Sequence, residues 1–455
     1  MEMILEFLRD VLSQPALLIG IMSCVGLIAL KRPFHKVMTG TLKPILGYLM
    51  LAAGAGVIVS NLDPLGKMIE HGFHITGVVP NNEAIVAVAQ KVLGVETMSI
   101  LVVGLLMNLC IARFTKFKYV FLTGHHSLFM ACLMSAVLGT AGLSGIELIL
   151  VGGFLMGAWS AISPAIGQSY TSKVTDGDEI AIGHFGSLGY YLSAWVAKYV
   201  GKADDSTEDI EIPEKWGFLR DSTLSTALTM IVFYLIAAFA AGSEFVATLS
   251  GDMSPYLYAV MSAMNFAVGV TIVYSGVRMI LGDLIPAFQG IATKIIPNAI
   301  PAVDCAVFFT YAPTAVVLGF ISSFIGGIIG MLILGAVGGV LIIPGLVPHF
   351  FCGATAGIYG NATGGRRGAA VGAFLNGLAI TFLPALALPV LGQLGFQNTT
   401  FGDADFAVMG LVLGHAFEWI GMAGIYGIVA IAALVLIIPN FIKTKGKVIN
   451  YVEEE

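Results

Sequence analysis

Long apolar stretches alternate with short polar connections along almost the whole chain. They cover residues 14–30, 40–60, 97–112, 119–140, 144–166, 224–248, 254–281, 303–321, 323–347, 369–394 and 406–440. The apolar residues run continuously instead of occupying every second position, which favours helices over a membrane β-barrel. Because a helix of this kind can cross a hydrocarbon layer, the pattern predicts an all-α polytopic membrane protein with about eleven transmembrane helices.

The composition supports this class and excludes others. Hydrophobic residues make up 57% of the chain and charged residues 11%, whereas about a quarter of a typical soluble protein is charged. The net charge is −6 and no basic block is present, so we expect no nucleic-acid partner. The sequence has no GxxxxGK[ST] motif, which argues against a P-loop nucleotide site. Five scattered cysteines and no metal-ligand spacing predict neither a disulfide framework nor a bound metal or other cofactor.

The basic residues gather in a few connections, and these predict the orientation. They are Lys31, Arg32, Lys36 and Lys43, then Arg113, Lys116 and Lys118, then Arg278 and Lys294, then Arg366 and Arg367, then Lys443, Lys445 and Lys447. Cytoplasmic connections of membrane proteins carry an excess of lysine and arginine. We therefore expect these groups in the cytoplasm, with the N-terminus outside, the C-terminus inside and an odd number of crossings.

Residues 171–222 form an acid-rich segment in a chain otherwise poor in charge. Its placement in the cytoplasm leaves two interpretations open. It is either a solvated surface loop or a face that docks a partner protein.

A weak internal similarity relates Phe121–Thr123 to Phe308–Thr310. Each precedes an apolar span, a Gly-Gly pair and a proline. We therefore divide the chain, a single membrane domain over 1–455, into repeats 14–170 and 224–400 followed by a final helix 406–440. With an odd number of spans per repeat the second copy is inverted, a plan that puts the substrate at mid-depth between broken helices.

Polar side chains inside such a chain are the first candidates for a site, because they are costly in lipid unless paired or facing a wet cavity. Thr123–His126 reads TGHH, and adjacent helix residues point about 100° apart, so we expect only one of these two histidines to face a cavity. Gly183–Gly186 reads GHFG, where glycine permits close approach to a ligand. A histidine that caps carbonyls, or a plain turn, is the alternative in each case.

Two further segments combine polar residues with helix breakers. Asp304 follows Pro297 and Pro301 and either caps a short helix or faces the substrate. Residues 344–365 are rich in glycine, proline and small residues. Irregular backbone at membrane depth is tolerated only inside protein or beside water, so we expect a re-entrant hairpin there.

At these residues the sequence resembles the membrane subunit (EIIC) of the ascorbate-type phosphoenolpyruvate-dependent phosphotransferase systems. The matches, in order along nearly the whole chain, are KRPFHKVMTGTLKPILGYLMLAAGAG, TGH, VTDGDEIAIGH, GVRMILGDLIPAFQGI, IPNAIPAVDCA and IIPGLVPHFF. The resemblance implies a multi-pass protein of the bacterial inner membrane. It implies a homodimer in which a V-shaped dimerisation part holds a mobile core, and the core moves as an elevator. It also implies that separate EIIB and EIIA proteins supply the phosphoryl group.

The resemblance also assigns site residues. Those expected to contact substrate are His125, His184, Asp304, Ala354 and Thr355, together with four positions at which this chain departs from the ascorbate pattern: Phe129 and Phe185, where glutamine is expected, and Asn82 and Glu83, where Thr-Tyr is expected. Asp304 is also the candidate for orienting the hydroxyl that accepts phosphate. Loss of two amides removes hydrogen-bond partners for ligand oxygens, and sites of this type discriminate by roughly 10⁴. The substrate is therefore L-ascorbate or a related sugar, sugar acid or polyol.

Two other functions remain as alternatives. One is an ion-coupled secondary transporter that uses His125, His184 and Asp304 as a proton relay, and the other is a membrane-embedded enzyme. The enzyme lacks a convincing triad or metal cluster in the sequence. Dependence of uptake on cytosolic phosphotransfer proteins separates the phosphotransferase permease from the secondary transporter.

Overall fold

The computed structural model describes residues 11, 14–74, 77–80, 82–177, 180–210, 222–392 and 399–441. Its longer helices are α2 (Pro15–Ala29), α3 (Phe34–Phe73), α4 (Asn82–Phe114), α5 (Gly124–Thr140), α6 (Gly145–Ile166), α8 (Ser187–Val200), α9 (Ser222–Ala241), α11 (Pro255–Lys294), α12 (Pro313–Ala336), α13 (Leu346–Gly392), α14 (Ala404–Ile420) and α15 (Met422–Ile437). The short ones are α7 (Gln168–Val174), α10 (Ser243–Ser250) and the 3₁₀ turns η1 (Thr207–Asp209), η3 (Cys305–Thr310) and η4 (Ile438–Phe441). The prediction of an all-α polytopic membrane protein is confirmed. Within the described ranges seven helices are long and apolar enough to span a bilayer, or eight if the bent pair α9–α10 counts as one span.

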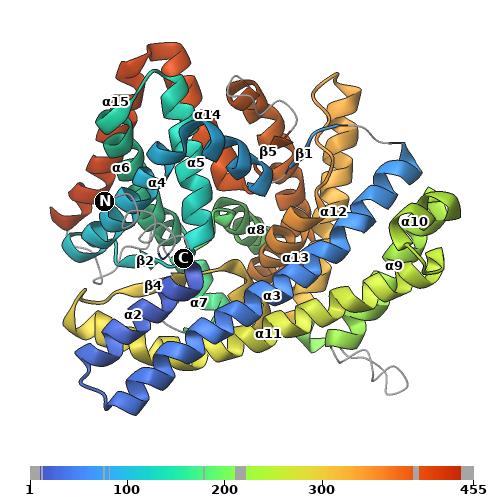
Figure 1. Ribbon diagram of the computed structural model, residues 1–455, viewed down its shortest axis with the longest axis horizontal. Coiled ribbons are helices and arrows are strands. Elements are labelled where there is room, and N and C mark those ends of the chain that lie inside the picture. Colours follow the sequence, from blue (N-terminus) through green and yellow to red (C-terminus); the bar gives the residue numbers. More distant parts are fainter. Residues whose placement is uncertain are drawn as a thin grey trace.

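Four helices, α2, α3, α9 and α11, pack together along one side of the molecule, with the short helix α10 beside α9, and most of the remaining helices lie on the other side (Figure 1). The two long helices α3 and α11 run antiparallel and approach closely through glycines. A Cβ atom added to Gly47 would lie 2.8 Å from the Gly276 carbonyl oxygen, and one added to Gly54 would lie 2.7 Å from that of Gly269. Such small residues are what allow helices to pack tightly in a membrane, where no hydrophobic effect drives association. We call α2, α3, α9 and α11 the scaffold helices.

Three short parallel strands outside the scaffold helices form a small sheet. They are β2 (Tyr119–Phe121), β4 (Ile300–Val303) and β3 (Ala181–Ile182), in the order β2-β4-β3. Phe121 pairs with Ala302, and Ile182 pairs with Val303. A second pair joins β1 (Val79–Pro80) to β5 (Thr399–Thr400). These strands connect parts of the chain that are far apart in sequence.

Helix α13 is a helical hairpin. Its backbone leaves the helical region at Gly364 and Gly365, and Gly365 has φ 60°, a left-handed conformation that glycine adopts without a Cβ clash. On either side of this break the two halves come together, since a Cβ added to Gly360 would lie 2.4 Å from the Gly368 carbonyl oxygen. The residues of the predicted small-residue hairpin, 344–365, thus form the first half of a longer hairpin and its tip.

Three expectations differ from the structure. The predicted spans 303–321 and 323–347 share one helix, α12, which begins at Pro313 where the fixed proline φ favours a first helical turn. The predicted final helix 406–440 is two helices, because Gly421 at φ 66° reverses the chain between α14 and α15. The segment 171–222 is not one solvated loop, because its described residues include β3 and the well-packed helix α8. Residues 178–179 and 211–221 of this segment lie outside the described residues.

Candidate functional site

The three-stranded sheet brings the predicted site residues together. His125 lies four residues after Phe121 of β2, His184 two residues after Ile182 of β3, and Asp304 directly after Val303 of β4. The carboxyl ends of parallel strands meet at one edge of a sheet, where ligands bind in many proteins. Further main-chain bonds continue the pairing beyond the strands, from Leu122 N to Ala302 O at 2.9 Å and from Gly183 N to Val303 O at 2.7 Å. The sheet thus fixes three segments, each carrying one polar residue, at a common edge.

His125 lies at the start of α5 between two partners. Its Nε2 is 3.3 Å from Asp304 Oδ2, and its Nδ1 is 3.1 Å from the Tyr48 hydroxyl of α3. Asp304 also caps η3, because its Oδ1 accepts a hydrogen bond from Ala306 N at 3.0 Å. The capping interpretation of Asp304 is therefore confirmed, and its contact with substrate stays a prediction. One oxygen caps the turn, and the other faces a histidine that is 36% exposed.

His126 and His184 form a buried pair of imidazoles. Their ring centroids are 3.8 Å apart, and the two residues are only 3% and 4% exposed. His184 Nδ1 accepts hydrogen bonds from Gly186 N at 3.2 Å and from the Tyr190 hydroxyl at 2.8 Å. His126 Nδ1 accepts from Phe185 N at 3.4 Å. Both histidines of the TGHH sequence thus belong to one cluster, which the 100° spacing alone did not predict.

Asp403, at the start of α14, adds a buried carboxylate to the cluster. Its Oδ1 is 3.9 Å from His184 Nδ1 and accepts from the Cys352 thiol of α13 at 2.8 Å. Its Oδ2 accepts from the Asn82 side-chain amide at 2.5 Å, and the Asn82 Oδ1 in turn accepts from Gly402 N at 2.9 Å. Asn82, a predicted site residue, is therefore one contact removed from His184.

Asp405 holds the neighbouring elements in place. One oxygen accepts from Leu188 N at 2.9 Å, at the start of α8, and the other from the Ser187 hydroxyl at 2.8 Å and Trp159 Nε1 at 3.2 Å. Its own main-chain N–H donates to Phe185 O at 2.9 Å. A fully buried carboxylate of this kind is tolerated because donors surround it. It ties α14, α6 and the GHFG segment to one another.

The remaining predicted residues lie around the cluster in different settings. The Phe129 ring is 5.8 Å from that of His125 and 5.6 Å from that of His126. The Phe185 ring is fully buried and stacks on Phe121 at 4.6 Å, so it packs into the aromatic core. Thr355 donates its hydroxyl to Phe351 O of its own helix, and Ala354 is fully buried. The side chain of Glu83 lies outside the described residues.

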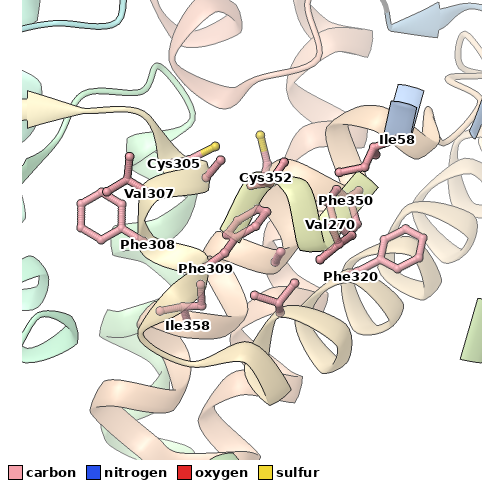
Figure 2. Close-up of a cluster of buried hydrophobic side chains, with 14 of the residues drawn as sticks. Ile58, Val270, Cys305, Val307, Phe308, Phe309, Phe320, Phe350, Cys352 and Ile358 are labelled. Atoms are coloured by element: carbon pink, nitrogen blue, oxygen red, sulfur yellow. The ribbon is translucent and has the colours of Figure 1, made fainter. Parts of the chain in front are cut away.

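Beneath these polar groups lies a dry aromatic core. Figure 2 shows Cys305 and Cys352 together with Phe308, Phe309 and Phe350 in this buried cluster. Cys305 follows Asp304, and Cys352 is the thiol that reaches Asp403. The polar cluster is thus bounded by apolar side chains from η3 and α13.

Comparison with known proteins identifies the family. A family model for the sugar-specific permease component of the PTS system, EIIC-GAT, matches residues 10–405. The chain belongs to this family. The ascorbate-specific PTS system EIIC component of Mycoplasma pneumoniae is 28% identical over 417 residues, which are 78% of this chain and 62% of that protein. The permease therefore spans less than two thirds of the length of this curated relative.

The structure of the permease brings His125, His184 and Asp304 close together, and their contact with substrate stays a prediction. It adds three residues that sequence reasoning missed. The sequence does not select His126, because the spacing of adjacent residues on a helix favours only one of the two histidines at a site. Asp403 and Asp405 lie just before the apolar stretch that begins at residue 406, so the apolar stretches do not include them. An acidic pair between two apolar stretches in a chain with 11% charged residues is the signal that could have found them.

The spacing of three of these side chains is also compatible with a bound metal ion. His126, His184 and Asp403 each offer one ligand atom, all within 4.8 Å of one another. The Nδ1 atoms of both rings, however, already accept main-chain N–H bonds, and Asp403 already accepts an amide and a thiol bond. Hydrogen bonds within the protein thus account for the arrangement of these groups.

Proposed function

We propose that this chain is the EIIC membrane permease of a phosphoenolpyruvate-dependent phosphotransferase system of the ascorbate type. It translocates L-ascorbate or a related sugar, sugar acid or polyol, and separate EIIB and EIIA proteins couple transport to phosphorylation. The observation that carries the proposal is the family match over residues 10–405, joined to a polar histidine–aspartate cluster inside an apolar helical protein. In a bilayer such groups are costly unless they pair with one another or face a wet cavity, and residues of this kind commonly mark substrate pathways.

The proposed chemistry needs few protein groups. Imidazoles and carboxylates hold the substrate hydroxyls, and Asp304 orients the hydroxyl that accepts phosphate. The oxygen of this substrate hydroxyl forms a bond to phosphorus while the sulfur–phosphorus bond of an EIIB phosphocysteine breaks. The cysteine sulfur leaves as a thiolate, and the hydroxyl proton passes to a carboxylate. Asp304 suits this role because only one of its oxygens is occupied by the cap of η3.

We further propose that the chain consists of two inverted repeats, aligned differently from the 121/308 similarity. Phe121 ends a strand whereas Phe308 lies in a 3₁₀ turn, so those segments do not correspond. A better correspondence relates the 40-residue helices α3 and α11, which run antiparallel. At one constant separation along the chain, Gly47, Gly54 and Pro64 of α3 match Gly269, Gly276 and Pro286 of α11. Antiparallel equivalent helices are what inversion requires.

The scaffold helices are the proposed static, V-shaped part that dimerises, and the other helices are the proposed mobile core. The scaffold helices expose apolar side chains, as do helices of the proposed core. Those on the scaffold helices include Leu17, Ile21, Leu42, Leu46, Leu224, Leu228, Val232 and Ile236. An exposed face of this kind suits lipid or a second copy of the chain.

The proposed orientation has the basic end of the scaffold in the cytoplasm. The α2–α3 turn, which carries Lys31 and Arg32, lies near the end of α11, which carries Lys294, because a Cβ added to Gly26 would contact Ala287 O and one added to Gly290 would contact Gly26 O. Lys43 pairs with Asp283 at 3.7 Å at the same end. This clustering agrees with the positive-inside rule. Both chain ends lie outside the described residues, so the positions of the two termini stay predictions.

One experiment tests the proposed function. Purified permease in proteoliposomes is supplied on the inner side with enzyme I, HPr, EIIA, EIIB and phosphoenolpyruvate, and labelled substrate is added outside. We expect uptake to require all of these components and to yield a phosphate ester inside. Uptake of unmodified solute driven by a proton gradient alone would instead establish the alternative, a secondary transporter.

A further inference from the structure

The hydrogen bonds of the buried histidines define which of their nitrogens can serve a substrate. A main-chain N–H can only donate, so the Nδ1 atoms of His126 and His184, which receive the N–H groups of Phe185 and Gly186, must be acceptors. In a neutral imidazole the other nitrogen then carries the proton. Both rings therefore present an Nε2–H donor.

The two carboxylates Asp403 and Asp304 accept hydrogen bonds mainly from uncharged donors. Asp403 accepts from the Asn82 amide and the Cys352 thiol, and neither donor is a cation. Asp304 accepts from Ala306 N and faces His125. The donors that the structure gives to these two carboxylates include no lysine or arginine.

A protonated histidine would compensate the charge of only one of these two carboxylates. A proton on His125 balances Asp304, which it faces directly. His184 turns its Nδ1 toward Asp403 at 3.9 Å, but that atom is an acceptor for Gly186 N, so it offers Asp403 no proton. Asp405, the third buried acid, is satisfied by Leu188, Ser187 and Trp159. Among the described side chains, Asp403 therefore has no lysine or arginine partner, and the imidazole nearest to it offers no proton.

We propose that the transported substrate is a neutral polyhydroxylated compound, a sugar or polyol, and not a sugar acid. This inference rests on the proposed permease function and narrows its substrate class. A hydroxyl group can donate to Asp403 or Asp304 and accept from the Nε2–H groups of His126 and His184. An anionic ligand meets fixed negative charge in a desolvated site, where like charges repel much more strongly than in water.

The test compares neutral and acidic ligands of matched shape on the purified permease. Binding at pH 7 is measured by calorimetry for xylitol against xylonate, sorbitol against gluconate, and L-ascorbate. We expect at least one neutral compound to bind at least tenfold more tightly than its acid and than L-ascorbate. Tighter or equal binding of an acid, or no binding by any neutral compound, overturns the inference.

A charge-neutralising variant examines the cause. Asp403→Asn should strengthen binding of the acids at least fivefold relative to the neutral compounds. Asp283→Asn, which removes a carboxylate from the scaffold helix α11, should leave the ratio unchanged. An unchanged ratio in Asp403→Asn overturns the electrostatic argument, and if this variant does not fold, the ratio in the unaltered protein decides the class. The dependence of uptake on phosphoenolpyruvate is measured separately, so a wrong substrate class and a wrong permease assignment give different results.

Discussion

The hydroxyl of Tyr48 lies 3.1 Å from Nδ1 of His125. Tyr48 belongs to the scaffold helix α3, whereas His125 begins α5 on the other side of the molecule (Figure 1). The bond therefore joins the proposed static part to the proposed site. If the core moves as an elevator, this bond exists in one state and is broken in the other.

Tyr48→Phe removes that bond without changing the shape of the side chain. A hydrogen bond of this kind is worth about 1 kcal/mol, so we expect the variant to shift the balance of the two states and alter the uptake rate about fivefold. Substrate affinity of the state in which the bond is absent should not change. The measurement is initial uptake in proteoliposomes alongside equilibrium binding.

The control is Tyr234→Phe. The Tyr234 hydroxyl donates to Asn61 O, a bond between α9 and α3 within the scaffold, so its loss affects both states equally. A Tyr48→Phe variant whose uptake rate matches that of Tyr234→Phe would contradict a moving boundary between α3 and α5.

The glycine contacts between α3 and α11 give a prediction for stability. Gly54→Val places a side chain where an added Cβ alone would lie 2.7 Å from the Gly269 carbonyl oxygen and 2.8 Å from Val273 N. Overpacking of this type costs about 1–3 kcal/mol, so we expect the variant to lose its folded form at a lower temperature in detergent. Gly56→Val is the matched control, because a Cβ at Gly56 meets nothing within 4 Å. Equal thermal stability of the two variants would show that α3 and α11 do not pack in this way.

The helices of this protein could be predicted from its apolar runs, because a span must be apolar over its whole length. The strands could not. β2 and β3 are three and two residues long, and their pairing with β4 depends on contacts between segments far apart in the sequence. The spacing of residues along a single helix likewise could not reveal that His126 meets His184, since the partner arrives on another element. His125 and Asp304 stand out because each lies within an apolar stretch, and His184 stands out because a glycine precedes it in the sequence GHFG.

The two phenylalanines that replace expected glutamines should respond differently to substitution. Phe129 lies beside His125 and His126, so the amide of Phe129→Gln can reach the polar cluster. Phe185 is fully buried against Phe121 and Phe406, where an amide without partners costs about 1–3 kcal/mol. We expect Phe129→Gln to change ligand affinity while the protein stays folded, and Phe185→Gln to lower its thermal stability.

Both variants are compared by thermal unfolding and by binding of L-ascorbate and a neutral polyol. A gain of ascorbate affinity in Phe185→Gln with unaltered stability would mean that this side chain reaches the ligand, as the resemblance to ascorbate permeases implies, and that its packing in the aromatic core does not matter.

Asp405 should be required for the fold of the site and not for the contact with substrate. Asp405→Ala leaves Leu188 N, the Ser187 hydroxyl and Trp159 Nε1 without their acceptor. A buried donor left without an acceptor costs about 1–3 kcal/mol, and three donors lose theirs, so we expect a large fall in thermal stability. Asp405→Asn keeps one carbonyl oxygen as an acceptor, so its thermal stability should lie between that of Asp405→Ala and that of the unaltered protein. Asp209→Ala removes an exposed carboxylate near η1 and should change stability little. If Asp405→Ala were as stable as Asp209→Ala but had lost ligand binding, Asp405 would contact the substrate itself, and the division between a supporting carboxylate at 405 and a ligand-facing one at 403 would be wrong.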